Sequence, residues 1–337
     1  MPGSPGGNTR SGYSGGPGSA APRRTQAGAA IITALLVVAL AAMLVTALFY
    51  RENVSIRAVE NRAAIAQVRW VERAAVDWAR VVIAADYRNP GTRSTDHMNE
   101  VWAVPIPETR LDETTTGGMA ITDSASNAFL AGQVIDAQAR FNLTNLINET
   151  TGQPDPKAIQ AFMRLLSFLG LPENLAMTVA YRIQLARPQF TNNEIVPPMR
   201  VPLMRLTDLL DLPGVEPGMI DQLAPHVVIL PQFTKVNLNT AMPEVIAAVL
   251  NVDLGRAQSG VRNRESRPYE NENLAIDGFG GEKTPEVTAL VDVKTSYFIV
   301  AGYIRYDRVE SYSETLLYRQ GTQPNNPSVK VIWQQRN

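Results

Sequence analysis

The stretch RRTQAGAAIITALLVVALAAMLVTALFYRENVSIR, residues 23–57, decides the fold of this chain. Two arginines and Gly28 precede a run of 22 uncharged residues, Ala29 to Tyr50. At 1.5 Å per helical residue the run spans roughly 33 Å, enough to cross a hydrocarbon core about 30 Å thick. It exceeds the apolar region of a signal peptide, about 7–15 residues, and no Ala-x-Ala site follows it. The sequence therefore predicts a transmembrane segment over residues 29–50.

Residues 1–22, the greater part of a leader that covers residues 1–28, are rich in Gly, Ser and Pro. They lack the apolar residues that a folded segment buries, so we expect them to be disordered. The leader carries Arg10, Arg23 and Arg24 and no acidic residue. By the positive-inside rule this charge keeps the N-terminus cytoplasmic and puts the bulk of the chain on the periplasmic side.

The chain becomes charged after Tyr50, but its apolar residues continue at helical spacing as far as Val82, with charged residues on the other faces. No Pro or Gly interrupts residues 29–87. The pattern predicts one helix of about 55–60 residues, roughly 85 Å long, whose part 51–87 is amphipathic and periplasmic. An ordinary signal anchor that tethers a periplasmic domain is the alternative for this stretch alone.

The composition is that of a globular protein with one membrane segment: 337 residues, 45% hydrophobic and 19% charged. A net charge of −1 offers no general attraction to nucleic acid. The absence of cysteine excludes disulfides and cysteine nucleophiles. The two histidines, His97 and His226, stand outside any nucleophile-elbow motif. We therefore expect no enzymatic activity, and a periplasmic hydrolase that uses one of these histidines remains a rival interpretation.

Short β-type runs flank a helical region. Three such runs follow the long helix: VWAVPIP, GGMAITD and FLAGQVIDAQARFNL. The segment TSYFIVAGYIRYDRVESYSETLLYR, residues 295–319, alternates over a long stretch before a last run, VKVIWQQ. The predicted fold class is α+β: an antiparallel sheet packed on the N-terminal helix and interrupted by an inserted all-α domain. The sheet domain would comprise residues 88–141 and 286–337, and the insert residues 142–285.

The insert contains a half-repeat, RFNLTNL at 140–146 and KVNLNTA at 235–241. Each copy places Asn or Thr before a helical pattern, and Thr240 is predicted to cap a helix together with Glu244. Between the copies, LTDLLDLPGVEPGMIDQLAPHVVIL resembles a helix-hairpin-helix, a SAM-like unit, with Gly214 and Gly218 in the hairpin. The segments VNLNTAMPEVIAAVLNVDLGRA and RESRPYENENLAI resemble a second, degraded helix-hairpin-helix of the type found in competence DNA receptors.

A hairpin of this kind binds a DNA phosphate through backbone N–H groups and needs basic neighbours. Here its neighbours are acidic, and no Lys or Arg occurs between Thr207 and Lys235. The acidic residues are Asp208, Asp211, Glu216 and Asp221. Carboxylates at these positions argue against nucleic-acid binding and favour a protein contact or a structural role. A membrane-tethered periplasmic DNA-binding receptor that uses these units is the alternative function.

The start of the chain resembles the class III leader of type IV pilins and type II secretion pseudopilins. The resemblance lies in the basic leader, in Gly28, in the small residues Ala29 and Ala30, and in the apolar run that starts there. The resemblance implies that a prepilin peptidase cuts between Gly28 and Ala29 and that the new N-terminus is methylated. Most members have glutamate as the fifth mature residue, and this chain has Thr33. In such filaments that glutamate is thought to pair with a neighbouring N-terminal amine, because an unpaired carboxylate in a membrane is costly. The K-type minor pseudopilin of type II secretion lacks this glutamate. This chain resembles that class in the missing glutamate, in the start GAAIITALLVVAL and in its large soluble region.

This resemblance implies a pilin-like fold and a non-enzymatic role in export across the outer membrane. The subunit would lie at the tip of the pseudopilus and initiate its assembly, limit its length, or both. The implied partners are the I- and J-type minor pseudopilins, the major pseudopilin, the prepilin peptidase and assembly-platform proteins of the inner membrane. The implied location is the bacterial inner membrane, which the chain would cross once.

Calcium is the one candidate cofactor, because the resemblance extends to a class of pseudopilins that bind it. The segment RPYENENLAIDGFG offers Glu270, Glu272 and Asp277, hard oxygen ligands of the kind that calcium prefers. The segment lacks the spacing of an EF-hand, so a solvated acidic loop is the alternative. No other cofactor is expected.

Overall fold

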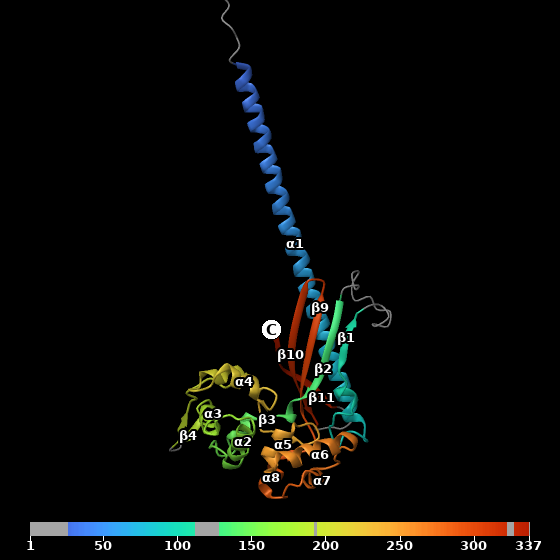
Figure 1. Cartoon of the computed structure of the whole chain (residues 1–337), viewed down its shortest axis with the longest axis vertical. Coiled ribbons are helices and arrows are strands. Elements are labelled where there is room, and N and C mark those ends of the chain that lie inside the picture. Colours follow the sequence, from blue (N-terminus) through green and yellow to red (C-terminus); the bar gives the residue numbers. More distant parts are fainter. Residues whose placement is uncertain (1–25, 112–127, 192–193, 322–326, 337) are drawn as a thin grey trace, which may run out of the picture. The chain divides into compact units, whose positions relative to one another are not determined.

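The computed structural model describes residues 26–111, 128–191, 194–321 and 327–336. The chain divides into two compact units, Met1–Arg62 and Ala63–Asn337. The long helix α1, Gln26–Arg88, comprises 63 residues and contributes to both units (Figure 1). The predicted continuous helix is therefore present, and it starts three residues before Ala29. Residues 1–25 of the predicted leader and the predicted β-type run GGMAITD, residues 117–123, lie outside the described residues.

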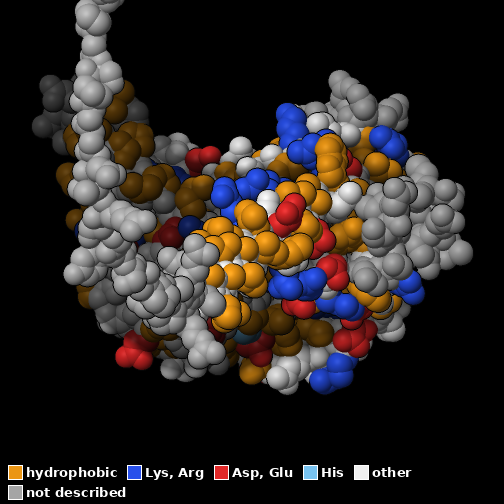
Figure 2. Space-filling view, turned by 90° about the horizontal axis from the view of Figure 1, so that it is seen from above, with side chains coloured by type: hydrophobic (Ala, Val, Ile, Leu, Met, Phe, Trp, Pro, Cys, Tyr) orange, Lys and Arg blue, Asp and Glu red, His pale blue; other side chains and the backbone are white. Residues whose placement is uncertain are grey.

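In the first unit, all side chains of α1 from Gly28 to Arg62 are exposed, including the large apolar ones. Figure 2 shows the protein from above, and hydrophobic side chains gather in the middle of the face seen there. Within the described ranges, α1 is the helix that is long and apolar enough to cross a membrane. A helix that is apolar on every side suits a lipid environment. The polar Thr46 side chain bonds to its own helix, since its Oγ1 donates to the Ala42 carbonyl oxygen at 2.8 Å.

The second unit contains a five-stranded antiparallel sheet with the order β1-β2-β9-β10-β11. Its strands are β1 (Ile106–Arg110), β2 (Ala128–Asp136), β9 (Tyr297–Tyr306), β10 (Val309–Gln320) and β11 (Ser328–Arg336). Strand β2 pairs along its whole length with β9, although the helical elements lie between them in the sequence (Figure 1). One sheet is thus assembled from both ends of the soluble region, as the sequence predicted.

The alternation of side chains along β9 gives the sheet two buried faces. Phe298 and Val300 point to the face that packs against Ala79 and Ile83 of α1. Ile299 points to the opposite face, where Val228, Leu230 and Ala137 cover it. This packing of the long helix on an antiparallel sheet confirms the predicted α+β fold class.

The helical elements form a separate core between β2 and β9, which runs from Phe141 to Val293. Its helices are η4 (Leu143–Leu146), α2 (Pro156–Phe168), α3 (Leu175–Gln184), η5 (Leu206–Asp211), α4 (Pro217–Leu223), α5 (Pro243–Leu250), α6 (Leu254–Ser266), α7 (Glu272–Gly278) and α8 (Pro285–Leu290). Its short strands are β3 (Phe141–Asn142), β4 (Gln189–Thr191), β5 (Glu194–Val196), β6 (Val227–Val228), β7 (Val236–Asn237) and β8 (Val291–Asp292). We call residues 141–293 the helical unit.

The sequence half-repeat is also a structural repeat. In each copy a two-residue strand enters a parallel pair, β3 with β6 and β7 with β8. The strand ends on an asparagine whose side-chain oxygen accepts from the backbone N–H two residues later. These residues are Asn142, which caps Thr144 at 3.1 Å, and Asn237, which caps Asn239 at 2.9 Å.

The predicted cap formed by Thr240 and Glu244 is wrong. Helix α5 starts at Pro243, and its N-cap residue Met242 makes no side-chain cap bond. The Thr240 hydroxyl instead donates to Asp136 Oδ2 at 2.6 Å. The buried carboxylate of Asp136 takes this donor, since an uncompensated buried acceptor costs more than an uncapped helix end.

Candidate functional site

The predicted processing residues lie in the first turns of α1. Gly28, Ala29 and Thr33 are all exposed. The Thr33 hydroxyl donates within its own helix, to the carbonyl oxygens of Ala29 at 3.1 Å and Ala30 at 3.0 Å. Position 33 therefore carries no charge, and its hydrogen-bonding group is already used by the same helix.

The predicted hairpin lies between η5 and α4. Gly214 has a φ of +80°, which a residue with a Cβ adopts only with strain. Gly218 is not in the turn, because α4 starts at Pro217 and includes it. The first arm is the 3₁₀-helix η5 and not an α-helix, so the unit is a shortened version of the predicted one.

Two carboxylates of the hairpin have structural partners. Asp208 Oδ2 accepts from the backbone N–H groups of Met204 at 2.8 Å and Arg205 at 3.0 Å. Asp211 Oδ2 pairs with Arg182 Nε at 3.1 Å. Asp208 thus fixes the entrance to η5, and Asp211 ties the end of η5 to α3.

The three candidate calcium ligands lie at α7. Glu270 is exposed, and Glu272 Oε2 lies 3.4 Å from Lys235 Nζ. Asp277 Oδ2 lies 2.5 Å from Lys283 Nζ. Two of the three carboxylates thus already have a lysine as their cation.

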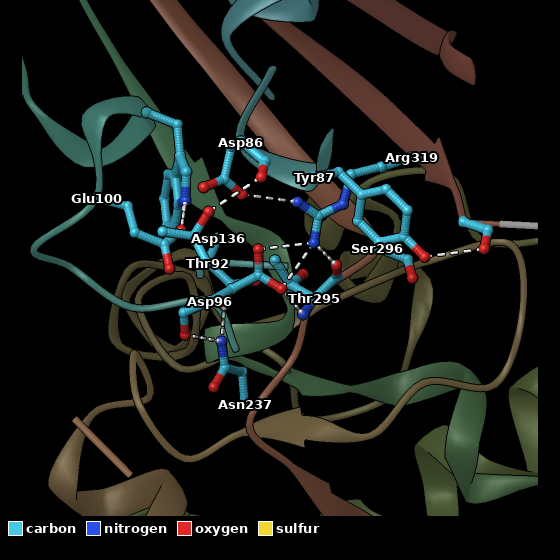
Figure 3. A network of polar contacts seen from close by, with 12 residues as sticks. Asp86, Tyr87, Thr92, Asp96, Glu100, Asp136, Asn237, Thr295, Ser296 and Arg319 are labelled. Atoms are coloured by element: carbon cyan, nitrogen blue, oxygen red, sulfur yellow. Dashed lines mark hydrogen bonds and ion pairs between the residues drawn. The ribbon is translucent and has the colours of Figure 1, made fainter. Parts of the chain in front are cut away.

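Sequence reasoning missed a buried polar cluster where α1, the sheet and the helical unit meet (Figure 3). Asp86 comes from the last turns of α1, and Asp96 and Glu100 come from the connection that follows. Arg319 reaches them from β10, with its guanidinium 3.2 Å from Asp86 and 2.6 Å from Asp96. The same guanidinium donates to the Thr295 carbonyl oxygen at 2.7 Å. We call Asp86, Asp96, Glu100 and Arg319 the junction cluster.

The junction cluster is tied to the helical unit through Asn237. The Asn237 side-chain amide donates to the Asp96 carbonyl oxygen at 2.9 Å and to Asp136 Oδ2 at 2.8 Å. Asp136 ends β2, and its other side-chain oxygen caps Gln138 at 2.7 Å. The Gln138 side chain in turn accepts from the Ser296 backbone N–H at 2.7 Å. Both ends of the sheet domain and the second half-repeat are therefore joined by one hydrogen-bonded network.

Burial changes the pKa values of two carboxyl groups of this cluster, Asp96 and Glu100. Burial raises the pKa of Asp96 to about 6, against the opposing effect of Arg319. Burial, followed by repulsion from Asp86, raises the pKa of Glu100 to about 8. Burial lowers the pKa of His97, whose Nε2 lies 3.4 Å from Glu100 Oε1, so this ring supplies no compensating charge at neutral pH. The raised pKa therefore favours the protonated, uncharged form of Glu100 at pH 7.

Within the described part of the chain, the carboxylates close enough to share an ion are Asp86, Asp96 and Glu100, whose oxygens lie within 4.8 Å of one another. The guanidinium of Arg319 already supplies the positive charge that Asp86 and Asp96 need. Calcium takes about six to eight oxygen ligands and would be repelled by a cation bound there. The junction cluster does not fit a calcium ion while Arg319 is in place.

We expect the raised pKa of Glu100 to make stability fall as the pH rises. Between the ordinary pKa of 4.5 and about 8, the folded protein keeps a proton that the unfolded chain releases. The free energy of unfolding should therefore drop across this window, by at most about 1.4 kcal/mol per pH unit. Glu100→Gln keeps a neutral group that can accept from Trp102 Nε1, so it should flatten this slope between pH 6.5 and 8. Urea unfolding of the full chain in detergent from pH 5 to 9 measures both slopes.

The control for this experiment is Glu108→Gln, because Glu108 is an exposed partner of Arg305. This variant should keep the slope of the parent protein. A parent-like slope in Glu100→Gln would contradict the assignment of the raised pKa to Glu100.

Comparisons with known proteins agree on one family. The family model described as type II secretion system (T2SS), protein K matches residues 139–232. The type II secretion system protein K of Pseudomonas aeruginosa is 28% identical over 297 residues, which cover 82% of this chain and 84% of the relative. A crystal structure of the GspK–GspI–GspJ complex from the type 2 secretion system of enterotoxigenic Escherichia coli matches with a TM-score of 0.65 at 19% identity. That match covers 83% of this chain and 99% of the other, and it concerns the fold.

Proposed function

We propose that this chain, which is similar to type II secretion system protein K over 82% of its length, is the minor pseudopilin at the tip of the pseudopilus. There it would initiate assembly, limit the length of the pilus, or both. The similarity supports the role of a minor pseudopilin, a component of a protein-transport machinery. The long apolar helix fits a single-pass membrane anchor.

The observation that carries the tip proposal is the state of Thr33. A subunit with a carboxylate at this position can pair with the N-terminal amine of a neighbour inside the membrane, where an unpaired charge is costly. Thr33 has no charge, and its hydroxyl is bonded to its own helix. The chain therefore offers no such pairing to a further subunit, which supports a position at the end of the assembly.

The helical unit supports the same proposal by its size. It has its own large core, and the polar network around Asn237 fixes it to the sheet at Asp136 and Asp96. A rigid domain joined in this way would obstruct a subunit that tried to add next to it. A domain on a flexible linker would not.

We propose a structural role without enzymatic activity. The two histidines have local partners: His97 lies beside Glu100, and His226 Nδ1 contacts the Gln222 carbonyl oxygen at 3.1 Å. His226 Nε2 lies 3.6 Å from Glu244 Oε2. Their positions on separate elements suit roles in packing.

The proposed partners are the I- and J-type minor pseudopilins, because the structural relative was solved in a complex with GspI and GspJ. The major pseudopilin, the assembly-platform proteins and the prepilin peptidase would act on the anchor segment. We propose that the peptidase cuts between Gly28 and Ala29 and that the N-terminus is cytoplasmic. The helical unit and the sheet would then be periplasmic.

Thr33→Glu tests the tip proposal directly. With a carboxylate at this position the subunit could be followed by another, so it should appear along the shaft and the pili should become longer. The measurement is immunogold labelling and length analysis of pili from cells that overproduce the major pseudopilin. The parent chain should label at most one end of a pilus. Thr33→Val, which matches threonine in shape and adds no charge, should behave like the parent.

Two results would contradict the proposal. The first is labelling of the parent chain along the shaft. The second is unchanged label position and pilus length in Thr33→Glu, provided that the variant reaches the membrane in normal amount.

A further inference from the structure

We propose that a pocket between the helical unit and β11 binds an apolar side chain next to a carboxylate on a partner protein. The pocket has a volume of about 330 Å³. It is lined by the end of α3, the connection that leads to η5, the residues after β6, and β11, with Ile183, Leu203, Leu230, Ile332 and Trp333 among its lining residues. This inference rests on the pocket and its charges and is independent of the tip proposal.

The apolar surface continues beyond the mouth of the pocket. Met199 is 72% exposed, Val201 75% and Met204 62%, and Ile332 on β11 is 41% exposed. Met204 and Ile332 also line the pocket. Exposed methionines adapt their shape to different apolar partners. An apolar area that extends past the pocket in this way suits a protein segment better than a small molecule.

Arg187 gives the pocket its charge. It lines the pocket and is half-buried, and no described residue forms a hydrogen bond or ion pair with its guanidinium. Arg200 lies nearby, since its backbone N–H donates to the Leu185 carbonyl oxygen at 3.1 Å, and its side chain likewise has no partner among the described residues. Among the described residues, Arg187 therefore lines an apolar cavity without a counter-ion, and the exposed Arg200 follows it in the chain.

Two neighbouring carboxylates that the structure describes have other partners and do not neutralise Arg187. Asp211 is paired with Arg182, which also donates to the Val201 carbonyl oxygen at 3.0 Å. Asp208 accepts from two backbone N–H groups at the entrance to η5. A guanidinium that has lost part of its hydration gains most from a planar, bidentate partner such as a carboxylate. The chemistry of the site thus selects an acidic group beside the apolar one.

The size of the pocket sets the apolar part of the partner. Cavities that hold drug-sized ligands range from about 300 to 1,000 Å³, and this one is at the lower end. It can take a single large side chain such as Phe or Leu. The carboxylate beside it can come from a neighbouring Asp or Glu or from the C-terminus of a partner chain.

Model compounds test the site on the full chain in detergent. The probes are N-acetyl-phenylalanine, whose carboxylate stands for a C-terminus, and acetyl-Gly-Phe-Asp-Gly-amide, which carries a side-chain carboxylate. Their controls are N-acetyl-phenylalanine amide and the same peptide with Asn. Binding is followed by tryptophan fluorescence, and Trp333→Phe removes the signal of the residue that lines the pocket.

We expect at least one acidic probe to bind about tenfold or more tightly than its neutral control, and the probe that binds identifies the source of the carboxylate. Arg187→Gln should abolish this preference. Arg308→Gln, which changes an exposed arginine of the β9–β10 turn, should keep it. Equal binding of acidic and neutral probes, a preference that survives in Arg187→Gln, or no binding of either acidic probe would overturn the proposal.

Discussion

Replacement of Arg319 by glutamine should lower the free energy of unfolding of the full chain by about 3–5 kcal/mol. Loss of one partner of a buried ion pair leaves the other charge buried without compensation, and that is the usual cost. Here Arg319 serves both Asp86 and Asp96 and is only 4% exposed itself. Urea unfolding in detergent at pH 7.5, above the raised pKa of Asp96, measures the full effect.

The loss in Arg319→Gln should shrink at pH 5, because Asp96 is then protonated and no longer needs a cation. Arg308→Gln provides the control, since Arg308 is 76% exposed and lies 3.7 Å from Asp307. An exposed pair of this kind contributes about 0–1 kcal/mol. A loss below about 1 kcal/mol in Arg319→Gln would mean that the junction cluster does not stabilise the fold.

Replacement of Phe162 by alanine should cost about 3–5 kcal/mol, the usual range for removing a fully buried phenylalanine. Phe162 lies in α2, is 0% exposed, and stacks on Phe141 with ring centroids 5.6 Å apart. Its effect should reach beyond the helical unit, because the Asn237 network joins that unit to the sheet. The four tryptophans all lie outside the helical unit, so their fluorescence reports on α1 and the sheet domain.

We therefore expect Phe162→Ala to shift the urea midpoint by the same amount whether it is followed by tryptophan fluorescence or by far-ultraviolet circular dichroism. Phe168→Ala is the matched control, because Phe168 ends the same helix and is 37% exposed. It should cost about 1 kcal/mol or less. A shift seen by circular dichroism alone would show that the helical unit unfolds independently, contrary to the role assigned to the junction.

The long helix and the sheet were predictable because their signals are local. A run of 22 uncharged residues followed by a continuous 3.6-residue pattern leaves α1 as the simplest structure. The alternation of Phe298 and Val300 against Ile299 predicted a strand with two different faces, and the structure puts those side chains into two separate cores.

The junction cluster could not be predicted, because its members are far apart in the sequence. One signal was present: Arg319 follows the buried residues Leu316 and Leu317 in a strand, and a charge in such a position needs a partner. The sequence does not reveal that the partners are Asp86 and Asp96, more than 200 residues away. The folded sheet brings them together.

One of the two wrong details of the helical unit has a similar cause. The Thr240 cap was inferred from neighbouring residues, but Asp136, 104 residues away, takes the hydroxyl. The resemblance to a helix-hairpin-helix predicts Gly218 in the hairpin, whereas α4 already starts at Pro217. A long-range contact thus decided the position of Thr240, whereas Pro217 is a local signal for the start of α4.

The most direct test of the pseudopilin account is the intact mass and N-terminal sequence of the protein isolated from membranes, with and without a prepilin peptidase. The account predicts a mature chain that begins at Ala29 and carries a methyl group when the peptidase is present. Without the peptidase the leader should remain attached. A chain that keeps its leader in the presence of an active peptidase would make residues 29–50 a plain anchor and would contradict assembly into a pseudopilus.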